Sequence, residues 1–242
     1  MKKIILFVSF LILSCNSDLK SDNPILNFQN ELIENEVTGS NVFKMVKEGK
    51  VIYNQVVNSG KLGDKDINDQ TIFPIWSMSK PITTVAMMVL YDRGLFKLQD
   101  NISKYLPEYE NVKCKGEDGI YPCKNKIKVI DLLTHRSGYT YYSDVYGENK
   151  FISPPSPLNK FTSSYHFNNL DDFSKAVANQ PLEFEPGSHY LYGLNQAILG
   201  RLVEVLSGVS FYEFLKLNIF DPMDMKETKF YLTTEERERI QP

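Results

Sequence analysis

A serine and a lysine one helical turn apart are the strongest candidates for chemistry in this chain. The segment Ser77-Met78-Ser79-Lys80-Pro81 precedes an apolar run from Ile82 to Leu90. We therefore expect a helix from about Ser77 to Arg93 with the serine at its start. Positions i and i+3 are neighbours on a helix surface, so the Lys80 amine can reach the Ser77 hydroxyl. Because a serine hydroxyl needs a base to become a good nucleophile, the pair predicts acyl transfer through a serine ester.

The Ser-x-x-Lys spacing does not identify a site by itself, because about one match is expected by chance in a chain of this length. Ser17 and Lys20 also fit the spacing, in a polar stretch without apolar periodicity. The copy at Ser77 differs because an apolar helix face follows it. The alternative interpretation of that copy is a helix-capping serine followed by a solvated lysine.

A tyrosine in the segment 186–195 is a second candidate for the same chemistry. Tyr192 precedes a predicted helix from Leu194 to Leu206, so its phenol could be offered to the serine site from the junction of a loop and a helix. It could equally pack its ring beneath that helix. His189, three residues earlier, is predicted to be a surface loop residue and not a base.

Composition limits the classes of function. With 242 residues, of which 42% are hydrophobic, the chain can bury one substantial core. The net charge of −3 and the absence of a basic stripe argue against nucleic-acid binding. His135, His166 and His189 are scattered, and none pairs with a cysteine or another histidine at the spacing of zinc ligands. The sequence therefore predicts neither a metal nor another cofactor.

The N-terminus has the pattern of an export signal. Lys2 and Lys3 precede an apolar segment from Ile4 to Leu13, which is too short to span a bilayer. The ending Ile-Leu-Ser-Cys resembles a bacterial lipobox, which would make Cys15 the lipidated first residue. The alternatives are a plain secretory signal or a short anchor. We predict a lipoprotein signal peptide over 1–14, a tether over 15–30 and a domain over 31–242. The protein would then be lipid-anchored to a membrane of the bacterial cell envelope, in a periplasmic or other extracytoplasmic space.

Two further cysteines agree with such a compartment. Cys114 and Cys123 flank a turn-rich segment, and the pair could close a small disulfide ring. The alternative is two free thiols.

The remaining pattern predicts a strand-rich start and a helical middle. Two β-prone runs separated by Lys-Glu-Gly-Lys indicate a hairpin, and several apolar periods indicate helices. The predicted elements are strands Val42–Val46 and Val51–Val57, a short helix Asp100–Tyr105, a helical turn Val129–His135 closed by Gly138, a loop-rich stretch Tyr139–Phe167, and helices Leu170–Ala178 and Leu194–Leu206.

Together these segments resemble the serine β-lactamase and penicillin-binding-protein superfamily. The match is best to the class C β-lactamase-like branch, which also contains family VIII esterases and D-aminopeptidases. The resemblance includes the hairpin near Val42, the Ser77 segment, Leu-Leu-Thr-His-Arg-Ser-Gly at 132–138, Pro186-Gly187 to Tyr192, and Ile-Phe-Asp-Pro-Met at 219–223. It implies a mixed α/β (α+β) fold of the β-lactamase/transpeptidase type. The N-terminal hairpin would belong to a central antiparallel sheet beside a helical region.

The resemblance also implies roles for individual residues. Ser77 would carry the acyl group, Lys80 would assist proton transfer, and Tyr192 matches the family's catalytic tyrosine. His135 lies in a motif that usually has an architectural role. The substrate would be a small-molecule ester, amide or β-lactam, or a cell-wall peptide. The alternative is a lipid-anchored binding or sensor protein, or an inactive fragment of such a hydrolase.

The sequence departs from the family pattern at two places. Many members have asparagine two residues after the tyrosine, where this chain has Leu194, and Asn195 would point elsewhere on a helix. A similar loss in esterase-like members favours an esterase- or peptidase-like activity over β-lactam hydrolysis. The family's Lys-Thr-Gly motif, whose late strand supplies an oxyanion-hole amide, does not occur in these 242 residues. Since losing one such donor costs about 10²–10³ in rate, we expect a C-terminally truncated member that lacks the late strands of the sheet.

Overall fold

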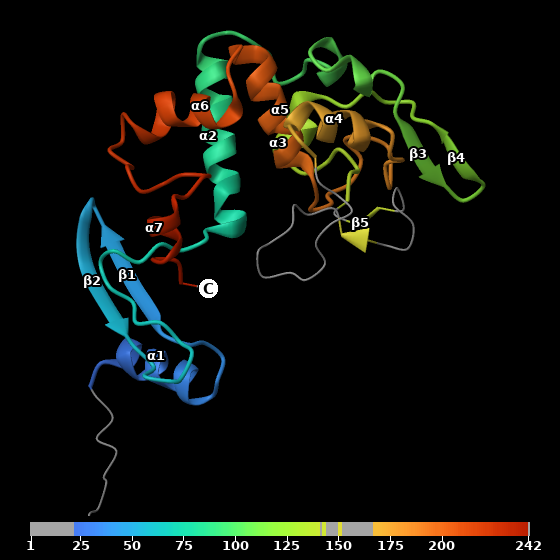
Figure 1. The fold of residues 1–242 in the computed structure, drawn as a ribbon. Helices are drawn as coiled ribbons and strands as arrows, with labels where there is room; N and C mark the ends of the chain where they lie inside the picture. The colour runs from blue at the N-terminus through green and yellow to red at the C-terminus, as the bar shows by residue number, and fades with distance from the viewer. Residues whose placement is uncertain (1–21, 141, 144–149, 152–166, 242) are drawn as a thin grey trace, which may run out of the picture. The chain divides into compact units, whose positions relative to one another are not determined.

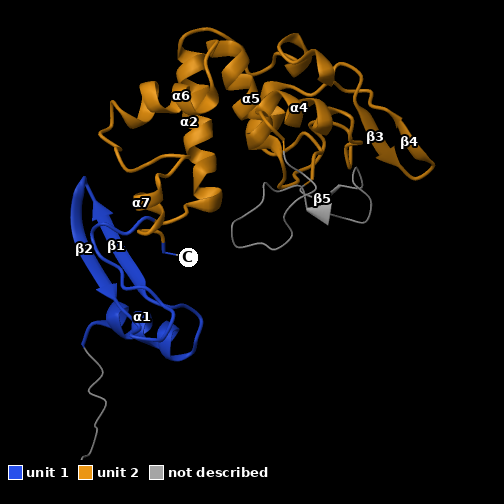
Figure 2. Ribbon diagram, in the orientation of Figure 1, with its two compact units in different colours: residues 1–72, 241 blue, residues 73–240, 242 orange. Residues whose placement is uncertain are grey.

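The computed structural model describes residues 22–140, 142–143, 150–151 and 167–241. The predicted signal peptide, Cys15, most of the predicted tether and most of the loop-rich stretch between Tyr139 and Phe167 lie outside these residues. The described chain forms two compact units, one ending at Ile72 and including Gln241, the other from Phe73 to Ile240 (Figure 2). Within the described residues, no helix is both long enough and apolar enough to cross a membrane.

Unit 1 consists of helix α1 (Pro24–Glu34) and the hairpin of β1 (Asn41–Lys47) and β2 (Lys50–Val57) (Figure 1). The hairpin confirms the predicted strands. Its turn places two successive residues at positive φ, the second a glycine, as tight hairpin turns favour. The tether predicted over 15–30 is wrong from Pro24 onward. α1 begins there because the Asn23 side chain accepts hydrogen bonds from the first backbone N–H groups of the helix.

Asp64 joins the loops of unit 1. Its carboxylate accepts hydrogen bonds from the Ser40 backbone N–H at 2.6 Å, the Ser40 hydroxyl at 2.6 Å and the Gln241 amide at 3.0 Å. The hydroxyl of Ser59 is a further donor. These donors, Ser40 first, lower the pKa of Asp64 to about 2, because they stabilise the charged carboxylate.

Unit 2 is mainly helical and carries the candidate site. Its helices pack around α5 (Asn195–Ser207), which contacts α2 (Ser79–Asp92), α3 (Val129–Leu133), α4 (Leu170–Ala178) and α6 (Phe211–Leu215) (Figure 1). The other elements are the 3-10 turns η1 (Trp76–Met78), η2 (Ile102–Lys104) and η3 (Pro107–Tyr109), strands β3 (Lys113–Gly116), β4 (Gly119–Pro122), β5 (Tyr142–Ser143) and β6 (Lys150–Phe151), the π-helical turn η5 (Lys216–Phe220) and α7 (Thr234–Arg237).

The core of unit 2 is apolar. Burial of such side chains contributes roughly 1.5–3 kcal/mol each, before the cost in chain entropy. The fully buried side chains include Met87 and Leu90 of α2, Leu132 of α3, and Ile198, Leu199 and Leu202 of α5. Because α2 and α5 pack against each other in this core, the first turn of α2 and the loop before α5 belong to the same compact unit.

The longer predicted helices are confirmed with shifted ends, whereas the short helix predicted over Asp100–Tyr105 is only the 3-10 turn η2. α4 has the predicted bounds. α5 ends at Ser207 and is followed by Gly208, whose positive φ suits the residue that closes a helix. α2 begins two residues later than predicted, and no side chain caps it. The interpretation of Ser77 as a helix cap is therefore wrong. α3 ends before His135, because that residue has a φ of +54°.

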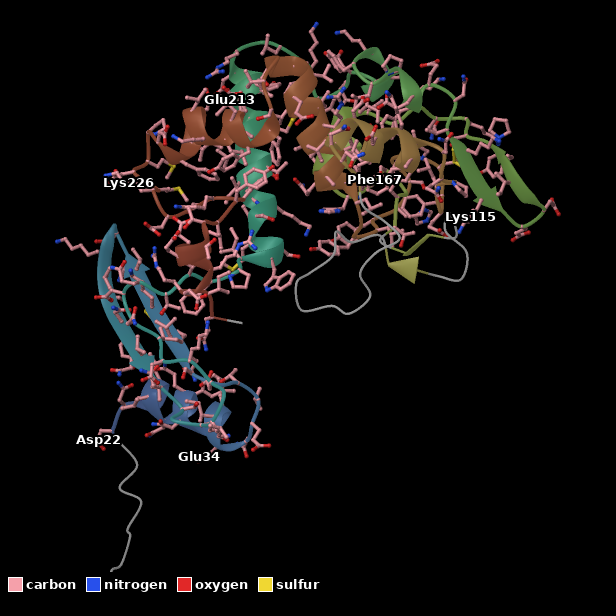
Figure 3. All side chains as sticks on the ribbon, viewed as in Figure 1. Asp22, Glu34, Lys115, Phe167, Glu213 and Lys226 are labelled. Atoms are coloured by element: carbon pink, nitrogen blue, oxygen red, sulfur yellow. A yellow bond between two sulfur atoms is a disulfide. The ribbon has the colours of Figure 1, made fainter. Side chains whose placement is uncertain are left out.

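The predicted disulfide is present between Cys114 and Cys123, whose Cα atoms are 5.1 Å apart. The two cysteines border the β3–β4 hairpin, which extends away from the helices of unit 2 (Figure 1). Lys115 on this hairpin (labelled in Figure 3) forms a 2.7 Å ion pair with Glu183. Backbone hydrogen bonds between β3 and Leu182 also tie the hairpin to the chain that leads toward Tyr192.

The fold is mixed α/β, as predicted. Its sheets, counted over the described residues, are the three two-stranded antiparallel pairs β1–β2, β3–β4 and β5–β6. No strand follows β6 in the described part of the chain.

Candidate active site

Ser77 lies exposed on a tight turn just before α2. The turn is closed by hydrogen bonds from Met78 N to Ile75 O at 2.8 Å and from Ser79 Oγ to Trp76 O at 2.7 Å. Trp76 has a φ of +43°, a left-handed conformation that costs free energy for a bulky residue. The hydrogen bonds of the turn thus stabilise the strained conformation at Trp76, and the next residue, Ser77, is exposed at the surface.

Two side chains reach the Ser77 hydroxyl. Lys80 Nζ, from the first turn of α2, donates to Ser77 Oγ at 2.9 Å. The Tyr192 hydroxyl donates to the same oxygen at 2.8 Å. Lys80 Nζ also lies 4.8 Å from the centre of the Tyr192 ring. The structure therefore brings together all three side chains that the sequence singled out, while their catalytic roles stay predictions.

The loop before α5 is attached to the turn after α3, and this attachment positions Tyr192. Leu191 N donates to His135 O at 2.8 Å, and Gly187 N donates to Arg136 O at 2.9 Å. The backbone at Gly193 passes so close to Tyr139 that an added Cβ would lie 2.0 Å from its carbonyl oxygen. Only glycine fits such an approach, so the residue next to Tyr192 is determined by packing.

A buried polar cluster lies next to the Tyr192 ring, and the sequence did not predict it. Ser137 Oγ donates to Asn195 Oδ1 at 2.5 Å, and Asn195 Nδ2 lies 3.0 Å from His135 Nδ1. The His135 ring packs against the Tyr192 ring with centroids 5.0 Å apart. Asn195 thus points away from the serine, as predicted. The Leu-Thr-His-Arg-Ser-Gly motif contains two of the three residues of this cluster. A sequence motif does not predict that these two side chains would contact Asn195, which lies far away in the chain.

The environment of His135 favours its neutral form. Burial, and then the positive charge of Lys80, lower the pKa of His135 below its usual value. The ring is half-buried, with Asn195 on one edge and Tyr192 on one face.

One group of possible metal ligands occurs among the residues that the structure describes. It consists of Cys114, Cys123 and Glu185. The two sulfurs are joined in the disulfide, so they offer no thiolates to a metal.

The chemistry available at Ser77 is nucleophilic attack assisted by proton transfer. An amine and a phenol both lie within hydrogen-bond distance of one hydroxyl. Either group, once deprotonated, can accept the serine proton, and the other can then donate to the same oxygen. Such an arrangement has the groups needed to activate a serine hydroxyl as a nucleophile.

The model of the Beta-lactamase family matches residues 31–241. The chain belongs to the Beta-lactamase family. The match includes the hairpin of unit 1, the Ser77 turn and the Tyr192 loop, so both units are part of the family pattern.

Proteins similar to this Beta-lactamase family chain include enzymes of more than one kind. Esterase EstB of Burkholderia gladioli is 26% identical over 216 residues, which are 87% of this chain and 51% of the relative. A putative D-alanyl-D-alanine carboxypeptidase of Salmonella heidelberg is 28% identical over 165 residues, which are 66% of this chain and 34% of the relative. The chain spans about half the length of the curated relatives it matches first.

Solved structures of the Beta-lactamase family share the fold. EstCE1, described as a hydrolase with promiscuous acyltransferase activity, superposes with a TM-score of 0.73 at 23% identity. The superposition covers 90% of this chain and 54% of EstCE1. At this identity the likeness shows the fold.

Proposed function

We propose that this member of the Beta-lactamase family is a serine hydrolase, esterase- or peptidase-like, that forms an acyl-enzyme on Ser77. One observation carries the proposal. Ser77 Oγ accepts hydrogen bonds from Lys80 Nζ at 2.9 Å and from the Tyr192 hydroxyl at 2.8 Å. Two ionisable groups of this kind at one exposed serine are what nucleophilic catalysis requires. Family membership and the names of the relatives, an esterase and a carboxypeptidase among them, support the same reaction class.

Acylation begins when Ser77 Oγ attacks the carbonyl carbon of an ester or amide. As the Oγ–C bond forms, the serine proton passes to Lys80 or Tyr192, and the carbonyl oxygen becomes an oxyanion. In water an amine and a phenol both have a pKa of about 10, so the accepting group must be the one that has lost its proton. The N-terminus of α2, which begins two residues after Ser77, favours the developing negative charge.

The tetrahedral intermediate then collapses. The bond to the leaving alcohol or amine breaks, and the leaving group takes the proton that Ser77 gave up. In the second half of the reaction a water molecule attacks the acyl carbon and gives a proton to Lys80 or Tyr192. The bond from the carbon to Ser77 Oγ then breaks, the proton passes to Oγ, and the acid leaves. The same two side chains serve both halves, because both lie within hydrogen-bond distance of Ser77 Oγ.

The side chains after Tyr192 favour esters over β-lactams as substrates. Leu194, which occupies the asparagine position of many family members, is buried in the core. Asn195 uses its amide to bind Ser137 and His135. The exposed Trp76 and Met78 flank Ser77, and apolar surface beside the nucleophile suits an apolar acyl group.

We also propose that the protein is a lipoprotein anchored to a membrane of the bacterial cell envelope, in a periplasmic or other extracytoplasmic space. The basic and apolar residues before Cys15 support this location. The disulfide between Cys114 and Cys123 is consistent with an oxidising compartment. Growth with a clickable fatty acid tests the proposal, since labelling of the protein should disappear in Cys15→Ala, and labelling that persists would overturn it.

Incubation of the purified protein with a fluorophosphonate probe, followed by intact mass measurement, tests the hydrolase. We expect one adduct on the wild-type protein and none on Ser77→Ala. Turnover of p-nitrophenyl butyrate should then depend on Ser77. A stable acyl adduct without product release would instead indicate a binding or sensor protein. No adduct on a protein with a cooperative unfolding transition would overturn the proposal.

A further inference from the structure

The imidazole ring of His135 packs against the ring of Tyr192. The two ring centroids are 5.0 Å apart and the ring planes are inclined by 33°. Tyr190 covers another part of the same imidazole at 6.1 Å. His135 adopts a left-handed backbone conformation with a φ of +54°, and its carbonyl accepts the Leu191 N–H. Positive φ is uncommon for residues other than glycine, although histidine adopts it more often than most, and the contacts with Tyr190, Tyr192 and Leu191 fix the ring in this place.

Hydrogen bonds determine which nitrogen of His135 carries the proton. Ser137 Oγ accepts the Tyr139 N–H at 3.2 Å and gives its only proton to Asn195 Oδ1 at 2.5 Å. The Asn195 amide is therefore oriented with its NH₂ group toward His135 Nδ1, 3.0 Å away. Because that NH₂ group can only donate, Nδ1 must be an acceptor and the proton lies on Nε2.

Among the described residues, the groups that face His135 do not stabilise a positive charge on its ring. The groups facing it are Lys80 from α2, Tyr190 and Tyr192 from the loop, and Asn195 from α5. The neighbouring Arg136 directs its guanidinium to the Gly187 carbonyl. The contacts of His135 within the described residues include no carboxylate, and Ser137 and Asn195 are fully buried. Protonation of Nδ1 would set two N–H groups against each other at 3.0 Å.

We propose that His135 is a positioning residue that holds Tyr192 at Ser77 while its imidazole is neutral and accepts from Asn195. Protonation breaks the bond to Asn195 and turns the ring, so the Tyr192 hydroxyl leaves Ser77 Oγ and acylation stops. The reaction therefore has an acid limit that belongs to His135, a residue that does not touch the substrate. This inference rests on the proposed function, because it concerns the acylation of Ser77.

The test compares two pH profiles of the full protein. One is the rate of Ser77 labelling by a fluorophosphonate, and the other is the NMR titration of His135, whose Cε1–H signal is assigned from its loss in His135→Phe. In the wild type we expect one midpoint, below the usual histidine value of about 6.5, in both profiles. In Asn195→Asp a carboxylate still accepts from Ser137 and now also accepts a proton from Nδ1. The His135 midpoint should then move up by roughly 1–3 pH units. Labelling should no longer fall at that midpoint, because the protonated ring stays bonded to residue 195.

Two more variants complete the design. His135→Phe keeps a ring against Tyr192 but cannot be protonated, so the acid limit that coincides with the His135 titration should disappear. If Asn195→Asp does not fold, the comparison of His135→Phe with the wild type still tests the inference. His189→Gln is the matched control, since its ring lies on Phe184 and the adjacent Ser188, and its profile should match the wild type.

Three results would overturn the inference. One is a His135 midpoint at or above the ordinary value in the wild type. Another is a labelling profile in Asn195→Asp that moves up together with the His135 midpoint, because protonation would then stop acylation without breaking the bond to residue 195. A wild-type protein that is never labelled, although His135 titrates low, would refute the proposed function and this inference with it. The first two results leave the hydrolase intact, so the two failures can be told apart.

Discussion

The Tyr192 hydroxyl lies 2.8 Å from Ser77 Oγ, although 115 residues separate the two in the chain. Lys80 approaches the same oxygen at 2.9 Å from only three residues away. The serine thus has one partner supplied by helix periodicity and one supplied by the packing of α5 against α2. Each partner can be removed separately.

Replacing Tyr192 with phenylalanine tests the second partner. The ring against His135 stays, and the hydroxyl at Ser77 is lost. We expect the rate of Ser77 acylation to fall about 10²–10⁴-fold, the usual contribution of a positioned acid or base, with little change in melting temperature. Time-resolved mass spectrometry with a fluorophosphonate measures this rate. Tyr231→Phe is the control, because Tyr231 is 75% exposed and packs on Tyr212. A rate equal to the wild type would contradict the role of Tyr192.

Replacing Lys80 with methionine tests the first partner. Methionine keeps most of the aliphatic stem and removes the amine that donates to Ser77. We expect a loss of acylation rate of about 10²–10⁴-fold, visible in the same assay. Lys97→Met, at an exposed position, should react like the wild type. If Lys80→Met retained full reactivity, the amine would have no part in activating the serine.

Gly193→Ala should disrupt the site without touching a reactive group. The new Cβ would lie 2.0 Å from the Tyr139 carbonyl oxygen, so the loop that carries Tyr192 must move. We expect a loss in the free energy of unfolding of about 1–3 kcal/mol, as for other overpacked positions, together with loss of labelling. Gly200→Ala is the matched control in α5, because its nearest contacts would be 3.4 Å away. Thermal denaturation should show a lower melting temperature for Gly193→Ala than for Gly200→Ala, and equal melting temperatures would contradict this prediction.

The disulfide should stabilise unit 2 measurably. Cys114 and Cys123 are nine residues apart, and closing a loop of this length contributes about 3 kcal/mol in the chain-entropy treatment. The double variant Cys114→Ala/Cys123→Ala should therefore unfold at lower urea concentration. A reductant should destabilise the wild type and leave the double variant unchanged. Equal urea midpoints for the two proteins would show that the hairpin needs no covalent link.

Asp64 should make the stability of unit 1 depend on pH in the acid range. Its pKa is lowered from 3.8 to about 2, so its contribution is present above pH 3.8 and is lost as the pH falls toward 2. We expect Asp64→Asn to lose about 2 kcal/mol at neutral pH, since hydrogen bonds to a charged group are lost. Urea denaturation across the pH range should show the difference between variant and wild type shrinking toward pH 2. Asp66→Asn, at an exposed position, is the control, and a difference that does not depend on pH would contradict this assignment.

Elements set by local interactions could be predicted from the sequence. Residues 170–178 form α4 as predicted, and the β1–β2 hairpin has the predicted strands, because periodicity and turn residues act over a few positions. α1 was missed because its start depends on the cap by Asn23 at the edge of a polar stretch. The short elements α6, η5 and α7 have too few residues for a periodic signal.

The sequence by itself determined the Ser77–Lys80 pair, since helix geometry places residues three apart on one face. It also indicated the family through the order of its motifs. Only the tertiary structure decided that Tyr192 reaches the serine and that Ser137, Asn195 and His135 form a cluster behind it. These contacts join segments far apart in the chain. They arise when α5 packs in the shared core and the loop before it binds the turn at His135, and no local pattern records that packing.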